Sequence, residues 1–191
     1  MAETPSTMLG IGTQAPEFSL PDPASGKSVS LADYTGKPLL VIFSCNHCPY
    51  VLHILESLTS FANEKQHQGL AVVMISANDV AGYPADGPDK MAQLAQSYGF
   101  EFPYLYDESQ QIARAYRAAC TPDFFLFDDK HQLVYRGQYD GSRPGNQIPV
   151  DGSDMRAAVD ALLAGDAIPG DQIPSVGCNI KWRPGNEPDY F

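Results

Sequence analysis

The chain has 191 residues, a formal net charge of −11 and a hydrophobic fraction of 43%. This length suits one globular domain with added segments, and the acidic excess disfavours nucleic acid and anionic membranes as partners. No apolar run reaches the roughly 20 residues that a transmembrane helix needs. The first residues lack the basic region and apolar core of a secretory signal, so we expect a cytoplasmic protein.

The first part of the chain predicts a hairpin and then a buried strand. Strand-like segments at 17–20 and 27–31 flank a turn that contains proline and glycine. Residues 39–43, Leu-Leu-Val-Ile-Phe, form an apolar run without polar alternation. Such a run is typical of a strand that is buried on both faces.

A β-α-β unit is expected over residues 39–76. From Pro49 to about His67 the apolar residues recur at helical spacing, and proline is well tolerated in the first turn of a helix. Residues 70–76 then form a second apolar run. We expect the two strands to be parallel and joined by a right-handed crossover.

The second half predicts further helices and strands before an irregular tail. Residues 78–88 form a polar loop after a strand, where binding residues often lie. The elements expected next are a helix over 91–98, a short strand over 103–107, a helix over 109–118, a hairpin over 124–137 and a helix from Asp151 or Ser153 to about 163. We expect a domain over 1–165 with a Pro- and Gly-rich tail, 166–191, packed on it. The pattern predicts an α/β fold with a mixed sheet and helices on both faces.

Cys45 and Cys48 form a CxxC motif at the junction of the first core strand and the first helix. Without an export signal the cysteines should mostly be reduced, which favours a catalytic or metal-binding pair over a structural disulfide. The N–H groups and dipole of a helix start favour a thiolate. We expect Cys45, with an exposed sulfur, to be the nucleophile and Cys48, in the first helical turn, to resolve the disulfide. His47 either stabilises the thiolate when protonated or is an ordinary surface residue.

Thr121 and Pro122 precede the apolar strand 124–127. They resemble the dipeptide with a cis proline that faces the CxxC motif in the thioredoxin fold. Local sequence alone fits a trans proline, but the position after the third helix favours cis. We expect Thr121 and Pro122 to shape a substrate groove whose backbone pairs with an extended peptide.

The chain resembles the thioredoxin-like superfamily, in its alkyl hydroperoxide reductase/thiol-specific antioxidant (peroxiredoxin-like) branch. The similar segments include Gly12-Thr13-Gln14-Ala15-Pro16, Cys45-Asn46-His47-Cys48-Pro49-Tyr50-Val51, Cys120-Thr121-Pro122-Asp123-Phe124-Phe125 and Gly177-Cys178-Asn179-Ile180-Lys181-Trp182. Together they resemble one largely uncharacterised subgroup. The resemblance implies a thioredoxin fold with an N-terminal hairpin extension and a redox-active disulfide in place of an organic cofactor.

The sequence departs from the peroxiredoxin pattern Pro-x-x-x-Thr-x-x-Cys. If Cys48 is taken as the cysteine of this pattern, Cys45 stands at the threonine position and Val41 at the proline position. If Cys45 is taken instead, Ile42 stands at the threonine position. Peroxiredoxins also place an arginine that activates peroxide at the start of the strand that here begins with Pro122, and this arginine is missing. Without these two hydrogen-bonding groups, peroxide cleavage loses transition-state stabilisation. Disulfide exchange is therefore favoured over peroxide reduction.

Two further cysteines are candidate redox thiols. Cys120, next to Thr121, should lie beside the CxxC motif, where it either resolves a disulfide or sulfenate or is a buried inert thiol. Cys178 lies in the tail. It either reaches the active site or, as the sequence favours, packs beside Trp182.

Metal binding is the rival class of function. Cys45, Cys48, Cys120 and His47 offer thiolate and imidazole ligands that suit Cu(I) or Zn. A cis proline over the CxxC motif normally blocks a metal, and the chain has only one such motif. We therefore expect no metal.

The sequence thus predicts a thiol–disulfide oxidoreductase of cell redox homeostasis with Cys45 and Cys48 as its catalytic residues. We expect protein or small-molecule disulfides as substrates and a thioredoxin- or glutathione-type system as the reductant. Electrons pass through the cysteines, so no organic cofactor is expected. A peroxiredoxin-like, antioxidant peroxide reductase is the alternative.

Overall fold

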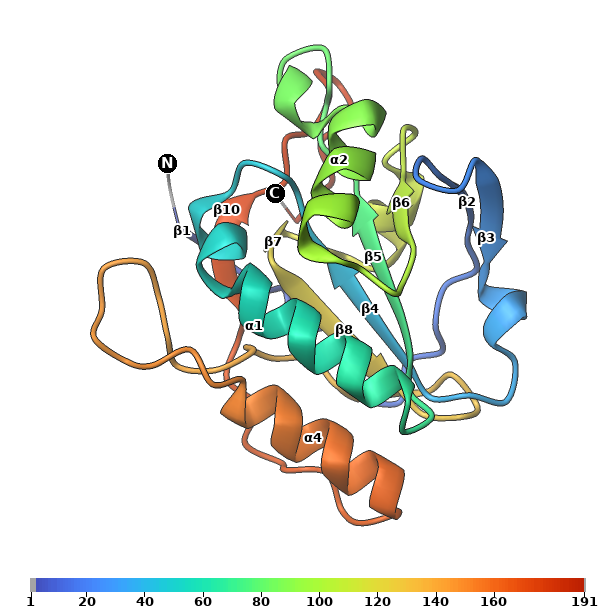
Figure 1. Cartoon of the computed structure of the whole chain (residues 1–191), viewed down its shortest axis with the longest axis vertical. Helices are drawn as coiled ribbons and strands as arrows, with labels where there is room; N and C mark the ends of the chain where they lie inside the picture. Colours follow the sequence, from blue (N-terminus) through green and yellow to red (C-terminus); the bar gives the residue numbers. More distant parts are fainter. Residues whose placement is uncertain (1–2, 191) are drawn as a thin grey trace.

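A five-stranded mixed sheet forms the centre of the protein, in a computed structural model that describes residues 3–190 (Figure 1). Its strands, in spatial order, are β6 (Tyr104–Tyr106), β5 (Ala71–Ser76), β4 (Leu39–Phe43), β8 (Asp123–Phe127) and β9 (Leu133–Tyr135). β4, β5 and β6 are parallel, whereas β8 and β9 run antiparallel to their neighbours. The predicted mixed sheet and its parallel β-α-β unit are confirmed.

Helices cover both faces of this sheet, as predicted. One face carries α1 (Pro49–Gln66), α2 (Pro88–Tyr98) and α4 (Ser153–Ala164), and the other carries α3 (Gln111–Ala115). Every residue of β4 is buried; Leu40 packs in the cluster under α1 and Val41 in the cluster on the opposite face. Burial on both sides explains why this strand has no polar position. None of the described helices is long and apolar enough to cross a membrane.

The predicted N-terminal hairpin is confirmed. It consists of β2 (Ser19–Asp22) and β3 (Lys27–Ser30), followed by the short 3-10 helix η1 (Leu31–Tyr34). The first strand starts at Ser19, two residues later than expected, and the carbonyl of Pro16 before it accepts a hydrogen bond from Tyr116 (3.0 Å). The hairpin lies beside β6 (Figure 1).

The helix predicted over 109–118 is much shorter than expected. Only Gln111–Ala115 is helical. Gln110 before it and Arg117 after it have left-handed backbone conformations, with φ of 63° and 52°, and such residues do not continue a right-handed helix. Because Gln110 lies outside the helix, its side chain is available to bind the tail.

The tail contains a strand that the sequence did not predict. β10 (Val176–Asn179) pairs antiparallel with β1 (Glu3–Pro5) on one side and with β7 (Cys120–Thr121) on the other. The three strands form a second, smaller sheet. Trp182, just beyond β10, is buried in the cluster on the α3 side of the central sheet.

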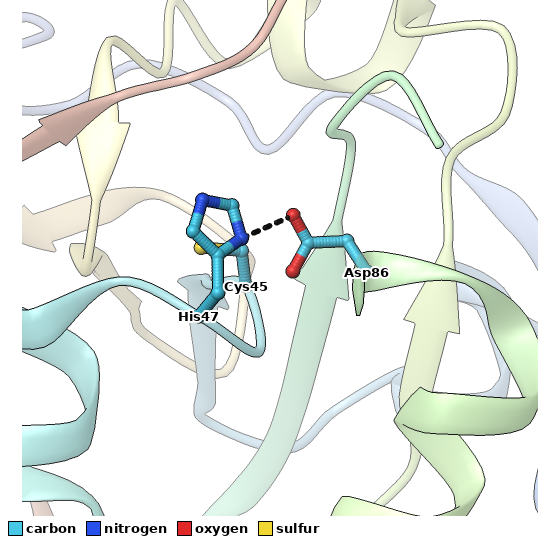
Figure 2. Close-up of side chains that lie close together, drawn as sticks. All are labelled: Cys45, His47 and Asp86. Atoms are coloured by element: carbon cyan, nitrogen blue, oxygen red, sulfur yellow. Dashed lines mark ion pairs between the residues drawn. The ribbon is translucent and has the colours of Figure 1, made fainter. Parts of the chain in front are cut away.

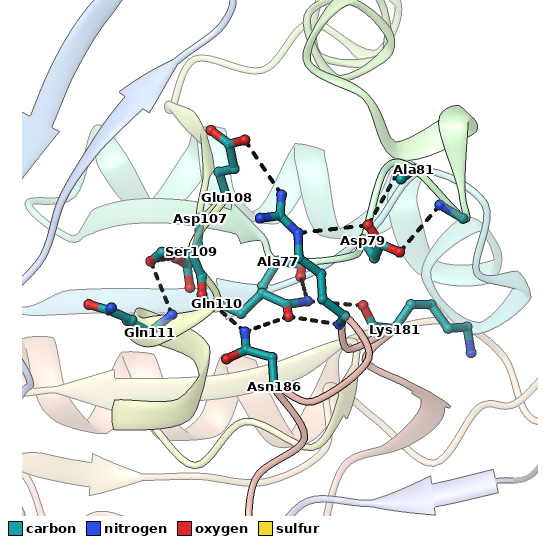
Figure 3. A network of polar contacts seen from close by, with 12 residues as sticks. Ala77, Asp79, Ala81, Asp107, Glu108, Ser109, Gln110, Gln111, Lys181 and Asn186 are labelled. Atoms are coloured by element: carbon teal, nitrogen blue, oxygen red, sulfur yellow. Dashed lines mark hydrogen bonds and ion pairs between the residues drawn. The ribbon is translucent and has the colours of Figure 1, made fainter.

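Gln110 ties the segment after β10 to the rest of the molecule (Figure 3). Its side-chain amide donates hydrogen bonds to the carbonyls of Ala77 (2.6 Å) and Lys181 (3.0 Å). Its side-chain carbonyl accepts one from the backbone N–H of Arg183 (2.9 Å). The carbonyl of Lys181 also accepts the N–H of Asp79 (2.8 Å). The tail is therefore anchored at its centre by buried hydrogen bonds.

Candidate redox site

Cys45 and Cys48 lie between the end of β4 and the start of α1. The helix begins at Pro49, so Cys48 is the N-cap residue, with an extended backbone (φ −69°, ψ 123°), and not part of the first turn as predicted. Pro49 explains the boundary, because proline fits the first helical position and keeps the residue before it out of the helical conformation. Cys48 is thus nearer to the helix N-terminus than Cys45.

Both cysteines are covered by protein. Cys45 is 1% exposed and Cys48 is fully buried, so the prediction of an exposed Cys45 sulfur is wrong. The reason is the loop after β5, which folds over the CxxC segment. The backbone N–H of Asn46 donates to Asp86 Oδ1 (2.7 Å), and the Asn46 side chain donates to the carbonyl of Ala85 (2.8 Å). A substrate reaches either sulfur only when this cover or a neighbouring segment moves.

Thr121 lies against both cysteines, and its peptide bond to Pro122 is cis, as predicted. Cys45 Sγ is 3.5 Å from Thr121 Oγ1. Cys48 Sγ, as a thiol, donates to the carbonyl oxygen of Thr121 at 3.1 Å. The structure therefore brings the CxxC cysteines, Thr121 and Pro122 together in one site.

The hydrogen bonds around the two cysteines favour a thiolate at Cys48. Hydrogen bonding from Cys45 lowers the pKa of Cys48, and the side chains of Cys178 and Thr121 act in the same direction, against the cost of burial. The pKa of Cys45 is raised by its hydrogen bond to Cys48, by burial and by the charge of Asp86. Within the pair these interactions favour the negative charge on Cys48 and the proton on Cys45, the reverse of the expected order.

Asp86 is a site residue that the sequence alone did not reveal (Figure 2). It is fully buried, and its Oδ2 lies 2.8 Å from His47 Nδ1 and accepts a hydrogen bond from the side chain of Asn78 (2.8 Å). The His47 side chain is 27% exposed and stacks on Tyr83, so it is held in place and is not an ordinary surface residue. The one signal in the sequence was the polar loop after a strand, which in the structure includes the short 3-10 helix η2 (Pro84–Asp86).

Among the described residues, one group of three side chains has the spacing of metal ligands. It consists of Cys45, His47 and Asp86, whose ligand atoms all lie within 4.8 Å of one another. The group differs from the ligand set expected from the sequence, because Asp86 takes part and neither Cys48 nor Cys120 does.

Cys120 is not part of the thiol group around Thr121. Its Sγ donates to the carbonyls of Pro122 (3.5 Å) and Ser175 (3.9 Å). Burial raises the pKa of Cys120 well above that of an ordinary thiol, and nearby negative charges add to this. These surroundings are those of a buried, unreactive cysteine.

Cys178, by contrast, lies next to the CxxC cysteines. It is 2% exposed and belongs to the same cluster as Cys45 and Cys48, whereas Trp182 belongs to the cluster on the other face of the sheet. The expected packing of Cys178 beside Trp182 is therefore wrong. β10 ends at Asn179, and the chain then leaves the strand, which separates the two side chains.

A large cavity of the protein lies away from the thiols. It has a volume of about 910 Å³, lies between the β2–β3 hairpin and α2, and none of the four cysteines lines it. A cavity of about 20 Å³ lies beside Pro122, between Tyr50 and Arg143. The groove next to the cis proline is therefore almost filled by the protein itself.

The fold and the site define a thioredoxin-fold protein with a buried pair of cysteines at a helix start. Residues 11–136 match the AhpC/TSA family, and the chain belongs to this family. "Putative peroxiredoxin MT2597" of Mycobacterium tuberculosis (strain CDC 1551 / Oshkosh) is 33% identical over 115 residues, which are 60% of this chain and 68% of that protein. "Thiol-disulfide oxidoreductase ResA" of Geobacillus thermodenitrificans is 27% identical over 125 residues, which are 65% of this chain and 67% of that protein.

Two solved structures are similar over nearly the whole chain. An uncharacterized conserved protein from Geobacillus kaustophilus is 48% identical with a TM-score of 0.94, over 96% of this chain and 98% of that one. A hypothetical protein from Sinorhizobium meliloti 1021 is 49% identical with a TM-score of 0.92, over 94% and 98% of the two chains.

The thioredoxin domain of a thiol-disulfide oxidoreductase from Bacteroides vulgatus shares the fold, at 21% identity and a TM-score of 0.57, over 67% of this chain and 88% of that one. Together with the family match, these likenesses show a thioredoxin-like fold and, at the level of the family, a redox protein of the peroxiredoxin-like or thiol–disulfide oxidoreductase kind.

Proposed function

We propose that this protein is a cytoplasmic thiol–disulfide oxidoreductase that cycles between the dithiol and the disulfide of Cys45 and Cys48 and serves cell redox homeostasis. The observation that carries the proposal is the position of Thr121, which contacts both sulfurs directly before the cis Pro122. A thiolate beside a protonated thiol is the arrangement that disulfide exchange requires, because one sulfur attacks and the other resolves.

The exchange proceeds through a mixed disulfide. The Cys48 thiolate attacks a substrate disulfide, forms a bond to one substrate sulfur and releases the other as a thiolate. Cys45 then loses its proton and attacks Cys48 Sγ, which forms the Cys45–Cys48 disulfide and expels the second substrate sulfur. His47, within 4.8 Å of Cys45 and held by Asp86, is placed to take that proton directly or through one water.

The substrates in this proposal are protein or small-molecule disulfides. A thioredoxin- or glutathione-type system returns the Cys45–Cys48 disulfide to the dithiol. The cycle needs no organic cofactor, because the two electrons enter and leave through the cysteines.

The proposal is tested by the reduction of a protein disulfide, such as that of insulin, with dithiothreitol as the electron donor. We expect turnover by the wild-type protein and a loss of at least about 100-fold in Cys48→Ser and in Cys45→Ser. Cys120→Ser is the matched control, since its thiol is buried without contacting the pair, and should retain activity. Wild-type turnover in a variant that lacks both Cys45 and Cys48 would sink the proposal.

Peroxide reduction is the second candidate, supported by the relative whose name is that of a peroxiredoxin. Thr121 offers a hydroxyl near Cys45, but the threonine and arginine of the peroxiredoxin pattern are missing from the sequence. Consumption of hydrogen peroxide with a thiol donor, abolished in Cys48→Ser, would promote this candidate above disulfide exchange.

Metal binding is a third candidate because Cys45, His47 and Asp86 converge. Thiolate, imidazole and carboxylate ligands suit zinc. However, Asp86 already accepts hydrogen bonds from Asn46 and Asn78 with its two oxygens, which lowers its value as a ligand. Stoichiometric metal in anaerobically purified protein, lost in Cys45→Ser, would favour this candidate over the redox cycle.

A further inference from the structure

β10 pairs along β7, where an extended substrate peptide was expected to pair. The strand runs antiparallel to β7, with Cys178 opposite Thr121 and Asn179 opposite Cys120. Just before the strand, the hydroxyl of Ser175 donates to the carbonyl of Pro122 (2.6 Å). Adding a strand to a sheet edge is a common way to bind a peptide. The tail of this chain thus takes the place of a bound peptide at the cis proline.

Gly177 makes this close fit possible. A Cβ atom at Gly177 would lie 2.0 Å from the carbonyl oxygen of Thr121, far inside any normal contact. The same oxygen accepts the hydrogen bond from Cys48. Only glycine therefore lets β10 lie directly on the peptide group that contacts Cys48.

The strand also brings a third sulfur to the site. Cys178 packs in the cluster that contains Cys45 and Cys48, and it is the strand partner of Thr121, whose carbonyl oxygen lies 3.1 Å from Cys48 Sγ. Cys120, one strand away, has its own carbonyl partners. Of the two cysteines outside the CxxC motif, only Cys178 is therefore within reach of Cys48.

We propose that Cys178 is a third redox thiol of this site and that β10 is a built-in strand that mimics a substrate. The proposal rests on the disulfide exchange proposed above. Once Cys48 carries a substrate sulfur, Cys178 gives up its proton and attacks Cys48 Sγ, which forms the Cys48–Cys178 bond and expels the substrate sulfur as a thiolate that takes up a proton. The substrate disulfide has then gained two electrons, and Cys48 and Cys178 have lost them.

The disulfide then moves within the protein. Cys45 gives up its proton and attacks Cys48 Sγ, which forms the Cys45–Cys48 bond and releases Cys178 as a thiolate that is reprotonated. No further electrons are exchanged in this step. Cys48 takes part in both disulfides, so one disulfide alternates among three thiols. The Cys48–Cys178 disulfide links β10 covalently to the active site and keeps the groove covered.

The anchoring of the tail keeps Cys178 close to the site. Lys181, three positions after Cys178, is held through its carbonyl by Gln110 and Asp79. When a substrate peptide displaces β10 from β7, the strand stays tethered on this side. Cys178 therefore competes with an incoming peptide at high effective concentration.

Disulfide mapping of Cys45→Ser tests the role of Cys178. The reduced variant is treated with one equivalent of diamide, the remaining thiols are alkylated, and peptides are analysed by mass spectrometry. We expect a Cys48–Cys178 disulfide, with Cys120 recovered in its alkylated form. A Cys48–Cys120 disulfide, or oxidised protein without a Cys48–Cys178 disulfide, would overturn the inference.

The same map of the wild-type protein separates this inference from the proposed function. A Cys45–Cys48 disulfide in the wild type, without Cys48–Cys178 in Cys45→Ser, keeps the exchange cycle and overturns the role of Cys178. No Cys45–Cys48 disulfide in the wild type counts against the proposed function itself.

A pair of glycine variants tests the cover formed by β10. Gly177→Ala places a methyl group against Thr121, whereas Gly170→Ala, in the same tail, adds one where no atom lies within 4 Å. We expect Gly177→Ala to raise the rate of Cys48 alkylation about tenfold and Gly170→Ala to leave it at the wild-type rate. Thermal melting shows whether both variants are folded. Equal alkylation rates in the two folded variants would overturn the inference that β10 covers Cys48. If Gly177→Ala fails to fold, the disulfide map of Cys45→Ser still decides whether Cys178 is a redox thiol.

Discussion

At the scale of single residues, Thr121 organises the thiol site. Its hydroxyl faces Cys45, its carbonyl accepts from Cys48, and its strand partner across the small sheet is Cys178. The side chains of Cys45, Cys178 and Thr121 lower the pKa of Cys48, whereas the hydrogen bond to Cys48 and burial raise the pKa of Cys45. The CxxC motif alone predicted a thiolate at Cys45, because it does not reveal the groups that β7 and β10 bring to Cys48.

The division of charge between the two cysteines predicts distinct pH profiles of alkylation. Because the pKa of Cys48 is lowered, its thiolate persists as the pH falls, and the midpoint of its alkylation should lie below the pKa of a free thiol, roughly 8.5. The pKa of Cys45 is raised, so the midpoint of its alkylation should lie above that value. Iodoacetamide rates for each cysteine, measured by mass spectrometry across pH, check this.

Cys45→Ala tests the cause of the low Cys48 midpoint. It removes the largest of the interactions that lower the pKa of Cys48, so the Cys48 midpoint should move to higher pH. Cys120→Ala removes a thiol that does not hydrogen-bond to Cys48 and should leave the midpoint in place. A lower midpoint at Cys45 than at Cys48 would contradict the assignment.

At the scale of elements, the short strand β10 connects the tail to the active site. It lies between β1 and β7 in the small sheet, and the segment that follows it is anchored by Gln110. The left-handed backbone of Gln110, which shortens α3, turns this side chain toward the tail. The irregular start of α3 thereby anchors the segment that follows Cys178.

Loss of the Gln110 side chain should loosen the tail. Gln110→Ala removes hydrogen bonds to Ala77, Lys181 and Arg183, and we expect a loss of about 1–3 kcal/mol in the free energy of unfolding, because the buried carbonyls lose their partner. Urea unfolding followed by the fluorescence of Trp182, the single tryptophan, measures this in the tail itself. Gln96→Ala, on the exposed side of α2, is the control, and an equal loss there would refute the role of Gln110.

At the scale of the whole molecule, the central sheet is buried between two apolar clusters, and this burial reaches an acidic residue. Asp123 opens β8 directly after Pro122 and is fully buried. Burial raises the pKa of Asp123 to about 7, although backbone and side-chain hydrogen bonds oppose this shift. The folded protein therefore favours the protonated form of this side chain.

This burial predicts that stability falls as the pH rises. A folded-state pKa above the unfolded value of 3.8 means that the stabilising contribution of Asp123 is fully present below about 4 and is lost as the pH rises through about 7. Asp123→Asn, which does not titrate, should gain stability relative to the wild type over this range, by about 3 kcal/mol. Urea unfolding at pH 4.5 and pH 8 measures this change in the free energy of unfolding, and Asp129→Asn, at an exposed position, is the control. If the free energy of unfolding of Asp123→Asn changed with pH in parallel with that of the wild type, the prediction would be contradicted.

The sequence alone determined the thioredoxin-like fold and the setting of the CxxC motif. The cis bond at Thr121-Pro122, which the structure contains, was expected from its position after the third helix and not from the local sequence. The apolar runs of β4 and β5 and the helical spacing after Pro49 are local patterns. Such features depend on neighbouring residues, because alternation and helical periodicity are properties of a single segment.

Only the tertiary structure decided which side chains surround the thiols. Asp86 approaches His47 from the loop after β5, and Cys178 approaches Cys48 from the far end of the chain. β10 has four residues, one of them Gly177, and carries no strand pattern of its own. Its place is determined by hydrogen bonds to β1 and β7, and pairing between distant segments is not encoded in the periodicity of either one.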